Sequence, residues 1–392
     1  MTQTYDFDEI IDRRSSDSIK WATGLVFGSD EATPMWVADM DFRIPQPVID
    51  ALARRAQHGI FGYPVRPASF YQSIANWWQR RHNWTVEKSW IVTAGGVVPS
   101  LGLAVLAFTN PGDKIIIQPP VYPPFFDIVE NNGRQLVNNP LKTDGKRYEM
   151  DFDDLEQKAR DQRARLLILC SPHNPVGRVW TADELNRLGE ICLKNNLLVI
   201  SDEIHCDLVF PGHRHIPIAS LSPELARNTV SLSAPTKTFN IAGLGAAYAL
   251  IPDPALRDRF CNQVEALHLS GSNVFGMLSL ETAYNQGEEW LDQLLGYLEC
   301  SLDTLEQFFK ERIPRLKVYR PEGTYLVWLD CTGLGLAPDE LKRFMVKQAK
   351  LGLNDGVPFG PGGQGYMRMN VACPRATLLQ ALEQLEGAVN SL

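Results

Sequence analysis

Short apolar runs alternate with longer amphipathic stretches through the middle of the chain. The runs are rich in leucine and β-branched residues and are bounded by turn residues, which is typical of buried strands. The stretches between them repeat their apolar residues at helical spacing. This alternation predicts an α/β sheet of mostly parallel strands with right-handed helical crossovers. Predicted strands are 90–94, 114–118, 165–170, 197–201 and 229–233, and predicted helices include 99–108, 154–162 and 181–194.

The pattern changes towards the C-terminus. Residues 245–251 also have a strand pattern, but they follow the preceding strand too closely for a helical crossover, so we expect an antiparallel strand there or one beside a different neighbour. A long amphipathic helix at 288–312 then opens a region that predicts a smaller α+β domain. Its further elements are strands 317–319, 325–329 and 366–371 and helices 341–351 and 375–392. We expect a large domain over 48–285 and a small domain made of 1–47 and 286–392.

Composition and charge narrow the function classes. A chain of 392 residues is long for a single core, and 44% hydrophobic with 21% charged residues is ordinary for a globular protein. The net charge of −8 without a basic block argues against a nucleic-acid partner. The longest apolar stretch, 101–108, is too short to span a bilayer, so no membrane partner is expected. The polar start at 1–10 lacks a signal-peptide pattern, and the seven dispersed cysteines predict reduced thiols and a cytoplasmic location.

Three polar segments each follow a predicted strand, and each carries one residue of chemical interest. These residues are Asn174, Asp202 and Lys237. Ligands of parallel sheets bind at the carboxyl ends of the strands, so the three should share a site. A lysine that forms a Schiff base, an aspartate that keeps a pyridine nitrogen protonated and an asparagine that bonds a phenolic oxygen suit pyridoxal 5′-phosphate (PLP). An isolated lysine would be interpreted as a surface residue, and an isolated aspartate as a helix cap or turn residue. The occurrence of all three residues together, each at a strand end, favours the PLP site.

Two further segments extend this predicted site. Gly95 and Gly96 lie between a strand and a helix, and the free N–H groups of the helix start can seat a phosphate. The chain has no Gly-Lys-Ser/Thr sequence at this turn, which excludes a nucleotide P-loop. Tyr122 lies in a proline-stiffened loop after a strand and can stack on a pyridine ring; ordinary packing of this tyrosine in its loop is the alternative.

The motifs together resemble a known family over nearly the whole chain. The chain is similar to fold type I PLP enzymes of the class I/II aminotransferase superfamily, and most to the MalY/PatB branch of cystathionine β-lyases, also called C–S lyases. The resemblance implies a mostly parallel seven-stranded sheet flanked by helices, plus a smaller α+β domain. Its motifs are Pro34-Met-Trp-Val-Ala-Asp-Met-Asp-Phe42, Phe61-Gly-Tyr-Pro64, Ser171-Pro-His-Asn-Pro175, Ser201-Asp-Glu-Ile-His205, Lys237-Thr-Phe-Asn240 and Tyr366-Met-Arg-Met-Asn370.

The resemblance also implies roles for individual residues. It gives Lys237 the Schiff base and Arg368 the substrate α-carboxylate, which a guanidinium binds as a bidentate fork. Tyr63 would reach the phosphate of a second subunit, which implies a homodimer with shared sites. The implied activity cleaves cystathionine or related cysteine S-conjugates to a thiol, pyruvate and ammonia, as in methionine biosynthesis. The other implied cofactor contacts are Asn174, Asp202 and Tyr122 as above, Gly96, Val97 and Thr236 at the phosphate, and His205.

Two departures from the aminotransferase pattern favour a lyase. His205 replaces a tyrosine that bonds the phenolic oxygen, and Gly245 replaces an arginine at the phosphate. His205 either contacts the cofactor or packs behind it. An aminotransferase remains the alternative, and a PLP-binding regulatory protein is a third hypothesis.

Three other patterns are set aside. The spacing of His205, Cys206, His213 and His215 matches no common zinc pattern, so no metal site is expected. Residues 360–365 lack the dinucleotide-loop spacing, and we expect a flexible active-site loop there. The segment 36–42, with two aspartates, is expected to shape the substrate mouth.

Overall fold

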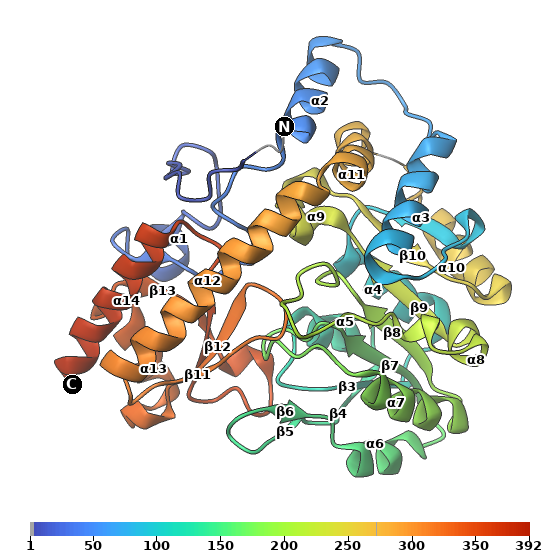
Figure 1. The fold of residues 1–392 in the computed structure, drawn as a ribbon. Coiled ribbons are helices and arrows are strands. Elements are labelled where there is room, and N and C mark those ends of the chain that lie inside the picture. The colour runs from blue at the N-terminus through green and yellow to red at the C-terminus, as the bar shows by residue number, and fades with distance from the viewer. Residues whose placement is uncertain (1–3, 272) are drawn as a thin grey trace.

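A computed structural model describes residues 4–271 and 273–392. A seven-stranded sheet forms the centre of its larger part (Figure 1). One strand, β10, is antiparallel to both of its neighbours, and all other neighbouring pairs are parallel. In spatial order the strands are β2 (Ile91–Ala94), β10 (Ala247–Leu250), β9 (Thr229–Ser233), β8 (Leu198–Asp202), β7 (Ala164–Cys170), β3 (Lys114–Ile117) and β4 (Gln135–Asn138).

Helices cover both faces of this sheet. Along β7, Leu166 and Ile168 pack in one core cluster, whereas Leu167 and Leu169 pack in another. Both faces of the strand are therefore buried, which explains why its sequence is a continuous apolar run and not an alternation of apolar and polar residues. One face is covered by α4 (Val97–Phe108), α5 (Pro124–Asn131) and α10 (Pro254–Ala266), and the other by α6 (Phe152–Ala159), α7 (Ala182–Lys194) and α8 (Pro223–Arg227).

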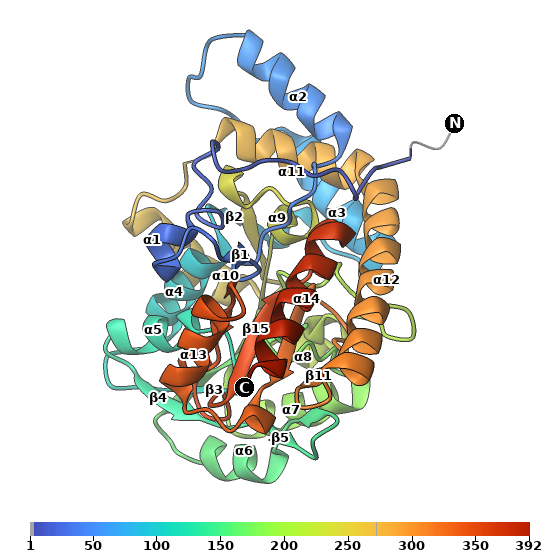
Figure 2. The ribbon, with the colours of Figure 1, turned by 90° about the vertical axis from the view of Figure 1, so that its left-hand side faces the viewer.

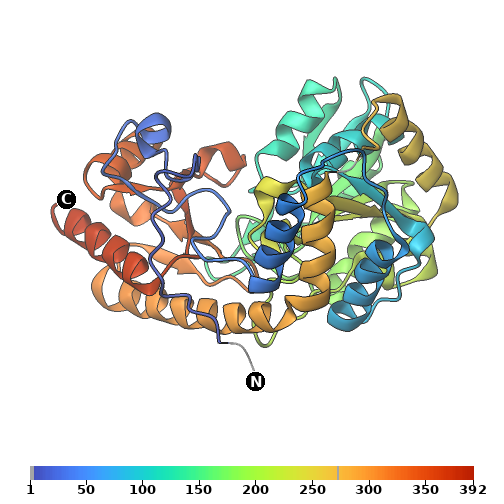
Figure 3. The same cartoon turned by 90° about the horizontal axis from the view of Figure 1, so that it is seen from above.

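A smaller part is built on the four-stranded antiparallel sheet β11-β12-β15-β14. Figure 3 shows the two parts side by side, with α12 (Glu288–Arg312) running along both. The N-terminal segment joins the smaller part, because β1 (Thr33–Pro34) pairs with β13 (Leu351–Gly352); Figure 2 views this side. The remaining strands of the part are β11 (Lys317–Tyr319), β12 (Leu326–Asp330), β14 (Asn354–Asp355) and β15 (Tyr366–Asn370), and its other helices are α1 (Thr23–Phe27), α13 (Pro338–Lys347) and α14 (Arg375–Asn390).

The remaining elements lie towards the top of Figure 1 or beside the large sheet. Trp77 and Trp78 on helix α3 belong to the same core cluster as residues of α12. The packing of these helices therefore joins the two parts. The exact boundary between domains stays a prediction. These elements are α2 (Gln46–Gln57), α3 (Ala68–His82), α9 (Pro235–Thr238) and α11 (Val274–Gln286), with the small pair β5 (Lys142–Thr143) and β6 (Tyr148–Glu149).

The structure confirms the predicted fold class and corrects some elements. The expected antiparallel strand is β10. The edge strand β4 was not predicted, because it is short and only partly buried. The helix predicted at 341–351 is wrong beyond Lys347: Lys350 adopts a left-handed φ of 51°, and Leu351 pairs with Thr33 in β13. Within the described ranges, no helix has the length and apolarity needed to cross a bilayer. Residues 1–3 of the polar start lie outside those ranges.

Candidate active site

The three predicted motif segments meet at the carboxyl ends of neighbouring strands. Cys170 at the end of β7 is in register with Asp202 at the end of β8, and Asp202 is in register with Leu232 on β9. The segments that follow these strands line a cavity of about 250 Å³. The structure therefore brings together nine of the ten predicted site residues: Gly96, Val97, Tyr122, Asn174, Asp202, His205, Thr236, Lys237 and Arg368.

Lys237 is a buried amine on the single turn α9, directly after β9. Its Nζ donates a hydrogen bond to the carbonyl oxygen of Ala38 at 2.6 Å. Burial and, after it, the Arg368 charge lower the pKa of Lys237 to about 8, although the carboxylates of Asp39 and Asp202 oppose this shift. A neutral amine is the form that attacks a carbonyl carbon or accepts a proton, and here it is populated near neutral pH.

Asp202 is a buried carboxyl group with few donors. One oxygen accepts a hydrogen bond from the Ile204 N–H at 3.2 Å. The pKa of Asp202 is raised to about 7, mainly by burial and also by the charge of Glu203, although the Ile204 N–H and Lys237 oppose the rise. A cation facing this group would favour its ionised form. The protonated nitrogen of a pyridine ring is such a cation.

Arg368 enters the cavity from β15 of the smaller sheet and is 4% exposed. One terminal nitrogen donates to Asn174 Oδ1 at 3.0 Å, and the other donates to Asn354 Oδ1 at 2.6 Å and to the Trp36 carbonyl at 3.1 Å. Its Nε is buried and has no hydrogen-bond partner among the described residues. Burial lowers the pKa of Arg368 to about 10, so the group remains a cation at neutral pH. A buried cation with an unused donor, beside a cavity, fits a carboxylate ligand.

His205 and Tyr122 form part of the cavity wall. Burial, together with the charges of Lys237 and Arg368, lowers the pKa of His205 to about 3, so the imidazole is neutral. Its Nδ1 is buried, and no residue in the described ranges forms a hydrogen bond with it. Tyr122 is partly buried, and burial followed by the Asp202 charge raises the pKa of its hydroxyl. Both rings line the cavity, and their contact with a cofactor stays a prediction.

The N-terminus of α4 borders the same cavity. The helix begins at Val97, and its N-cap residue Gly96 provides no side-chain cap. The first N–H groups of the helix therefore remain for an anionic ligand. Gly245 lies behind this turn at a φ of +57°, and a Cβ there would stand 3.3 Å from the Gly95 carbonyl oxygen. An arginine at position 245 would be strained and crowded, which explains this departure from the aminotransferase pattern.

Tyr63 is the predicted site residue that does not line the cavity. Its side chain is fully exposed in the segment between α2 and α3, together with Ile60, Phe61 and Val65. Its contact with the phosphate of a second subunit stays a prediction.

Sequence reasoning missed the partner of the lysine. The Ala38 carbonyl accepts bonds from both Lys237 Nζ and the Tyr325 hydroxyl, the latter at 3.0 Å. Every residue has a main-chain carbonyl, so the residue type at position 38 could not indicate this contact. Only the motif around Ala38 could have suggested that the segment lies at the site. Val37 and Ala38 do line the cavity, as expected of the segment 36–42. The two aspartates of that segment are used in ion pairs with Arg13 and Lys20, at 2.7–2.8 Å for the shortest contacts.

Comparison with known proteins identifies the family. Residues 35–385 match the family described as aminotransferase class I and II. The chain belongs to this family. It is 44% identical to the cystathionine beta-lyase PatB of Bacillus subtilis over 386 residues, which is 98% of this chain and 100% of PatB. It is 30% identical to the protein MalY of Escherichia coli over 99% of this chain and 100% of MalY.

A solved structure with a cofactor shares the fold. Cystalysin from Treponema denticola, which contains pyridoxal 5′-phosphate, superposes with a TM-score of 0.96 at 36% identity, over 99% of this chain and 100% of that one. The family member described here is therefore similar, over its full length, to proteins of the MalY/PatB branch, as the motifs indicated.

Proposed function

We propose that this protein is a PLP-dependent C–S β-lyase, which cleaves cystathionine or related cysteine S-conjugates to a thiol, pyruvate and ammonia. The observation that carries the proposal is one cavity that holds a buried lysine of lowered pKa, a buried aspartate and an arginine with an unused donor. These groups fit the aldehyde, the ring nitrogen and the substrate carboxylate respectively. The sequence similarity to cystathionine beta-lyase PatB supports the lyase reaction over transamination.

The residues divide the binding work between cofactor and substrate. Lys237 would hold the cofactor covalently and Asp202 would pair with its ring nitrogen. Asn174, whose amide oxygen accepts from Arg368, would orient the phenolic oxygen through its amide N–H. Tyr122 would cover one face of the ring. At the other end, Thr236, Gly96 and Val97 would bind the phosphate, and Arg368 would bind the substrate α-carboxylate.

Lys237 would also move the proton. PLP supplies an electron sink that makes the substrate Cα proton acidic. The lysine amine, with its pKa lowered to about 8, suits a general base at neutral pH. It removes the proton from Cα, and the C–S bond at Cβ breaks with its electron pair on sulfur. The net reaction consumes one water and yields the thiol, pyruvate and ammonia. The neutral imidazole of His205 adds no charge that would compete for the substrate carboxylate.

We further propose that the protein is a homodimer with shared sites. Support comes from the exposed apolar segment Ile60, Phe61, Tyr63 and Val65, whose side chains are 53–107% exposed. Exposed apolar clusters of this kind mark interaction surfaces. In the dimer, Tyr63 of the partner subunit would reach the phosphate. We place the enzyme in the cytoplasm because all seven cysteines are free thiols, which suits a reducing compartment.

The deciding experiment supplies cystathionine without a keto acid. Pyruvate is detected continuously with lactate dehydrogenase, and homocysteine with a thiol reagent. A lyase gives pyruvate, ammonia and homocysteine over many turnovers, whereas alanine plus a keto acid reacts far more slowly. Product formation that stops near one equivalent per site, and resumes only when a keto acid is added, would establish the aminotransferase instead.

A further inference from the structure

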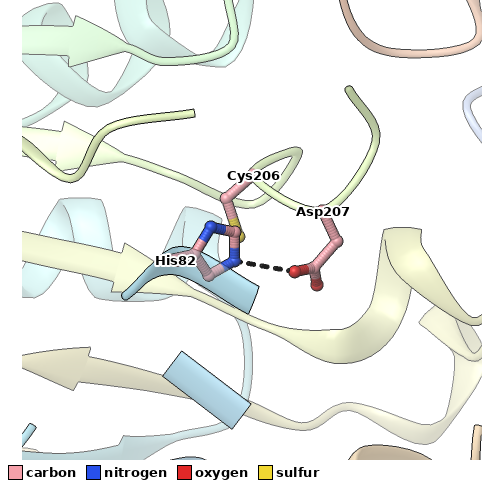
Figure 4. Close-up of side chains that lie close together, drawn as sticks. All are labelled: His82, Cys206 and Asp207. Atoms are coloured by element: carbon pink, nitrogen blue, oxygen red, sulfur yellow. Dashed lines mark hydrogen bonds and ion pairs between the residues drawn. The ribbon is translucent and has the colours of Figure 1, made fainter. Parts of the chain in front are cut away.

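A buried carboxylate lies beneath the active-site cavity, outside the residues that line it. This group, Asp207, is 4% exposed. One of its oxygens accepts from His82 Nε2 at 2.8 Å and from Trp77 Nε1 at 3.0 Å. The other oxygen accepts from the Thr238 hydroxyl at 2.8 Å. Figure 4 shows His82 and Asp207 joined in this way, with the Cys206 side chain beside them.

The cluster is a set of hydrogen bonds around one anion. His82 and Thr238 keep the pKa of the Asp207 carboxyl low despite its burial, and burial lowers the pKa of His82. Asp207 is thus ionised, and His82 is a neutral imidazole that donates its Nε2–H. Burial raises the pKa of Cys206 well above its usual value, so its sulfur is a thiol. Three side chains with ligand atoms this close can bind a metal. Here the donors already satisfy the carboxylate, and a protonated thiol is a poor ligand.

Asp207 joins three segments that meet only through tertiary contacts. Trp77 and His82 belong to α3, and Asp207 itself is the last residue of the turn 204–207 that follows β8. Thr238 is the residue after Lys237, at the end of the four-residue helix α9. Helix α9 has no side-chain cap at its start. A single uncapped turn has little stability of its own, so side-chain tethers must fix its orientation.

We propose that Asp207 is a positioning residue for Lys237, acting through the Thr238 hydroxyl. The carboxylate fixes the C-terminal end of the single turn that carries the lysine. Asp207 lies on the same segment as Asp202 and His205. Its bond to Thr238 therefore also sets the distance between that segment and the turn that carries Lys237. The proposal rests on the assignment of Lys237 as the base in the proposed function. It adds a group that never touches cofactor or substrate.

The chain contains a matched control beside this cluster. Glu203 is also fully buried and also pairs with a histidine, His215, at 2.9 Å. Its second oxygen accepts from the Ser231 hydroxyl at 2.9 Å. Ser231, however, lies within β9, where the strand pairs on both sides fix its backbone. Removal of either hydroxyl leaves a buried carboxylate short of one donor, but only Thr238 holds the turn of Lys237.

The test compares Thr238→Val with Ser231→Ala in the PLP-loaded enzyme. Exchange of the alanine Cα hydrogen with deuterated solvent, followed by NMR, measures proton transfer by Lys237 without a leaving group. We expect Thr238→Val to slow the exchange about tenfold, with KM for a cysteine S-conjugate within about twofold, because a displaced base loses rate more than binding. Ser231→Ala should stay within about twofold of wild type, although both variants unfold at similarly lower temperatures. Thr238→Ser should restore the rate.

A second readout does not depend on turnover. PLP is added to cofactor-free protein, and the imine is trapped with borohydride at set times and mapped by mass spectrometry. Capture by Lys237 should be slower in Thr238→Val than in Ser231→Ala. If Thr238→Val does not fold, Thr238→Ala should slow capture in its place, since it removes the same hydrogen bond to Asp207 without placing a methyl group against the carboxylate.

Two results would overturn this proposal but not the proposed function. One is a Thr238→Val variant whose rates of hydrogen exchange and PLP capture equal those of the wild type. The other is a Ser231→Ala variant whose rates fall as much as those of Thr238→Val. In either case Lys237 still carries the label. A label on another lysine would overturn the proposed function together with this inference.

Discussion

Replacement of Arg368 by lysine tests how the cavity captures an amino-acid substrate. The guanidinium donates hydrogen bonds to Asn174, Asn354 and the Trp36 carbonyl, and its Nε–H has no acceptor among the described residues. Its centre lies 5.1 Å from the Phe359 ring, which supports its planar face. An ammonium group has a shorter reach and no planar fork, so it cannot keep these three contacts and also bind a carboxylate through two parallel bonds.

The size of the effect follows from the bonds that are lost. A hydrogen bond to a charged group contributes about 1.5–3 kcal/mol, and loss of one partner in a buried charged pair costs about 2–5 kcal/mol. We expect kcat/KM for Arg368→Lys to fall by about 2–4 kcal/mol, which corresponds to about 30- to 900-fold. The decrease should appear mainly in KM, because the carboxylate is bound before and during the reaction.

The assay is pyruvate release from a cysteine S-conjugate, with PLP content measured by absorbance. Arg134→Lys is the control, since Arg134 is also a buried arginine, but its hydrogen bonds go to Thr109 and the Asn132 carbonyl, outside the cavity. Its kcat/KM should stay near wild type even if its stability falls. Unchanged kinetics in Arg368→Lys, with full PLP content, would refute the reasoning and move the carboxylate site elsewhere.

Three further predictions concern Lys237, Tyr63 and Asp202. Lys237→Ala should bind PLP without a covalent link, and borohydride reduction of the wild type should label Lys237; peptide mapping by mass spectrometry checks both. Lys237→Ala subunits mixed with Tyr63→Phe subunits should regain activity above either parent, because each heterodimer has one intact site; subunit exchange without recovery would show that each site uses one chain. In cofactor-free protein, the pKa of Asp202 is raised to about 7, so the folded state keeps a proton that the unfolded chain releases near pH 4. Stability should therefore fall as pH rises from about 4 to 7, and Asp202→Asn should flatten this slope in thermal unfolding curves.

Part of the site could be predicted because strand ends have a fixed place in a parallel sheet. Asp202 ends β8, and Asn174 and Lys237 follow its neighbours β7 and β9, so their meeting follows from chain order and the parallel arrangement. Arg368 belongs to a second sheet far along the chain, and no local pattern links it to these residues. Its position in the cavity was expected only through family resemblance.

Other parts of the site depend on tertiary contacts that leave no mark in the sequence. The Ala38 carbonyl accepts from Lys237, but any residue has a carbonyl. Asp207 looks like an ordinary acidic residue after a strand, and its three donors come from α3 and α9. Lys350 shows the same limit in the fold. The apolar periodicity predicted a helix as far as residue 351, but the helix ends at Lys347. Lys350 adopts a left-handed conformation although it is not a glycine, so its residue type did not indicate the break.

The charges of the cavity explain why cofactor and substrate should both stabilise the protein. Lys237 and Arg368 are both buried cationic groups, and the Arg368 charge is, after burial, a cause of the lowered pKa of Lys237. Against these cations the lining residues offer one carboxyl group, Asp202, since His205 is neutral. Burial penalises each charge that lacks a partner. A phosphate at the α4 terminus and a carboxylate at Arg368 would supply anions that pair with these buried cations, so the binding of cofactor and substrate should stabilise the folded protein.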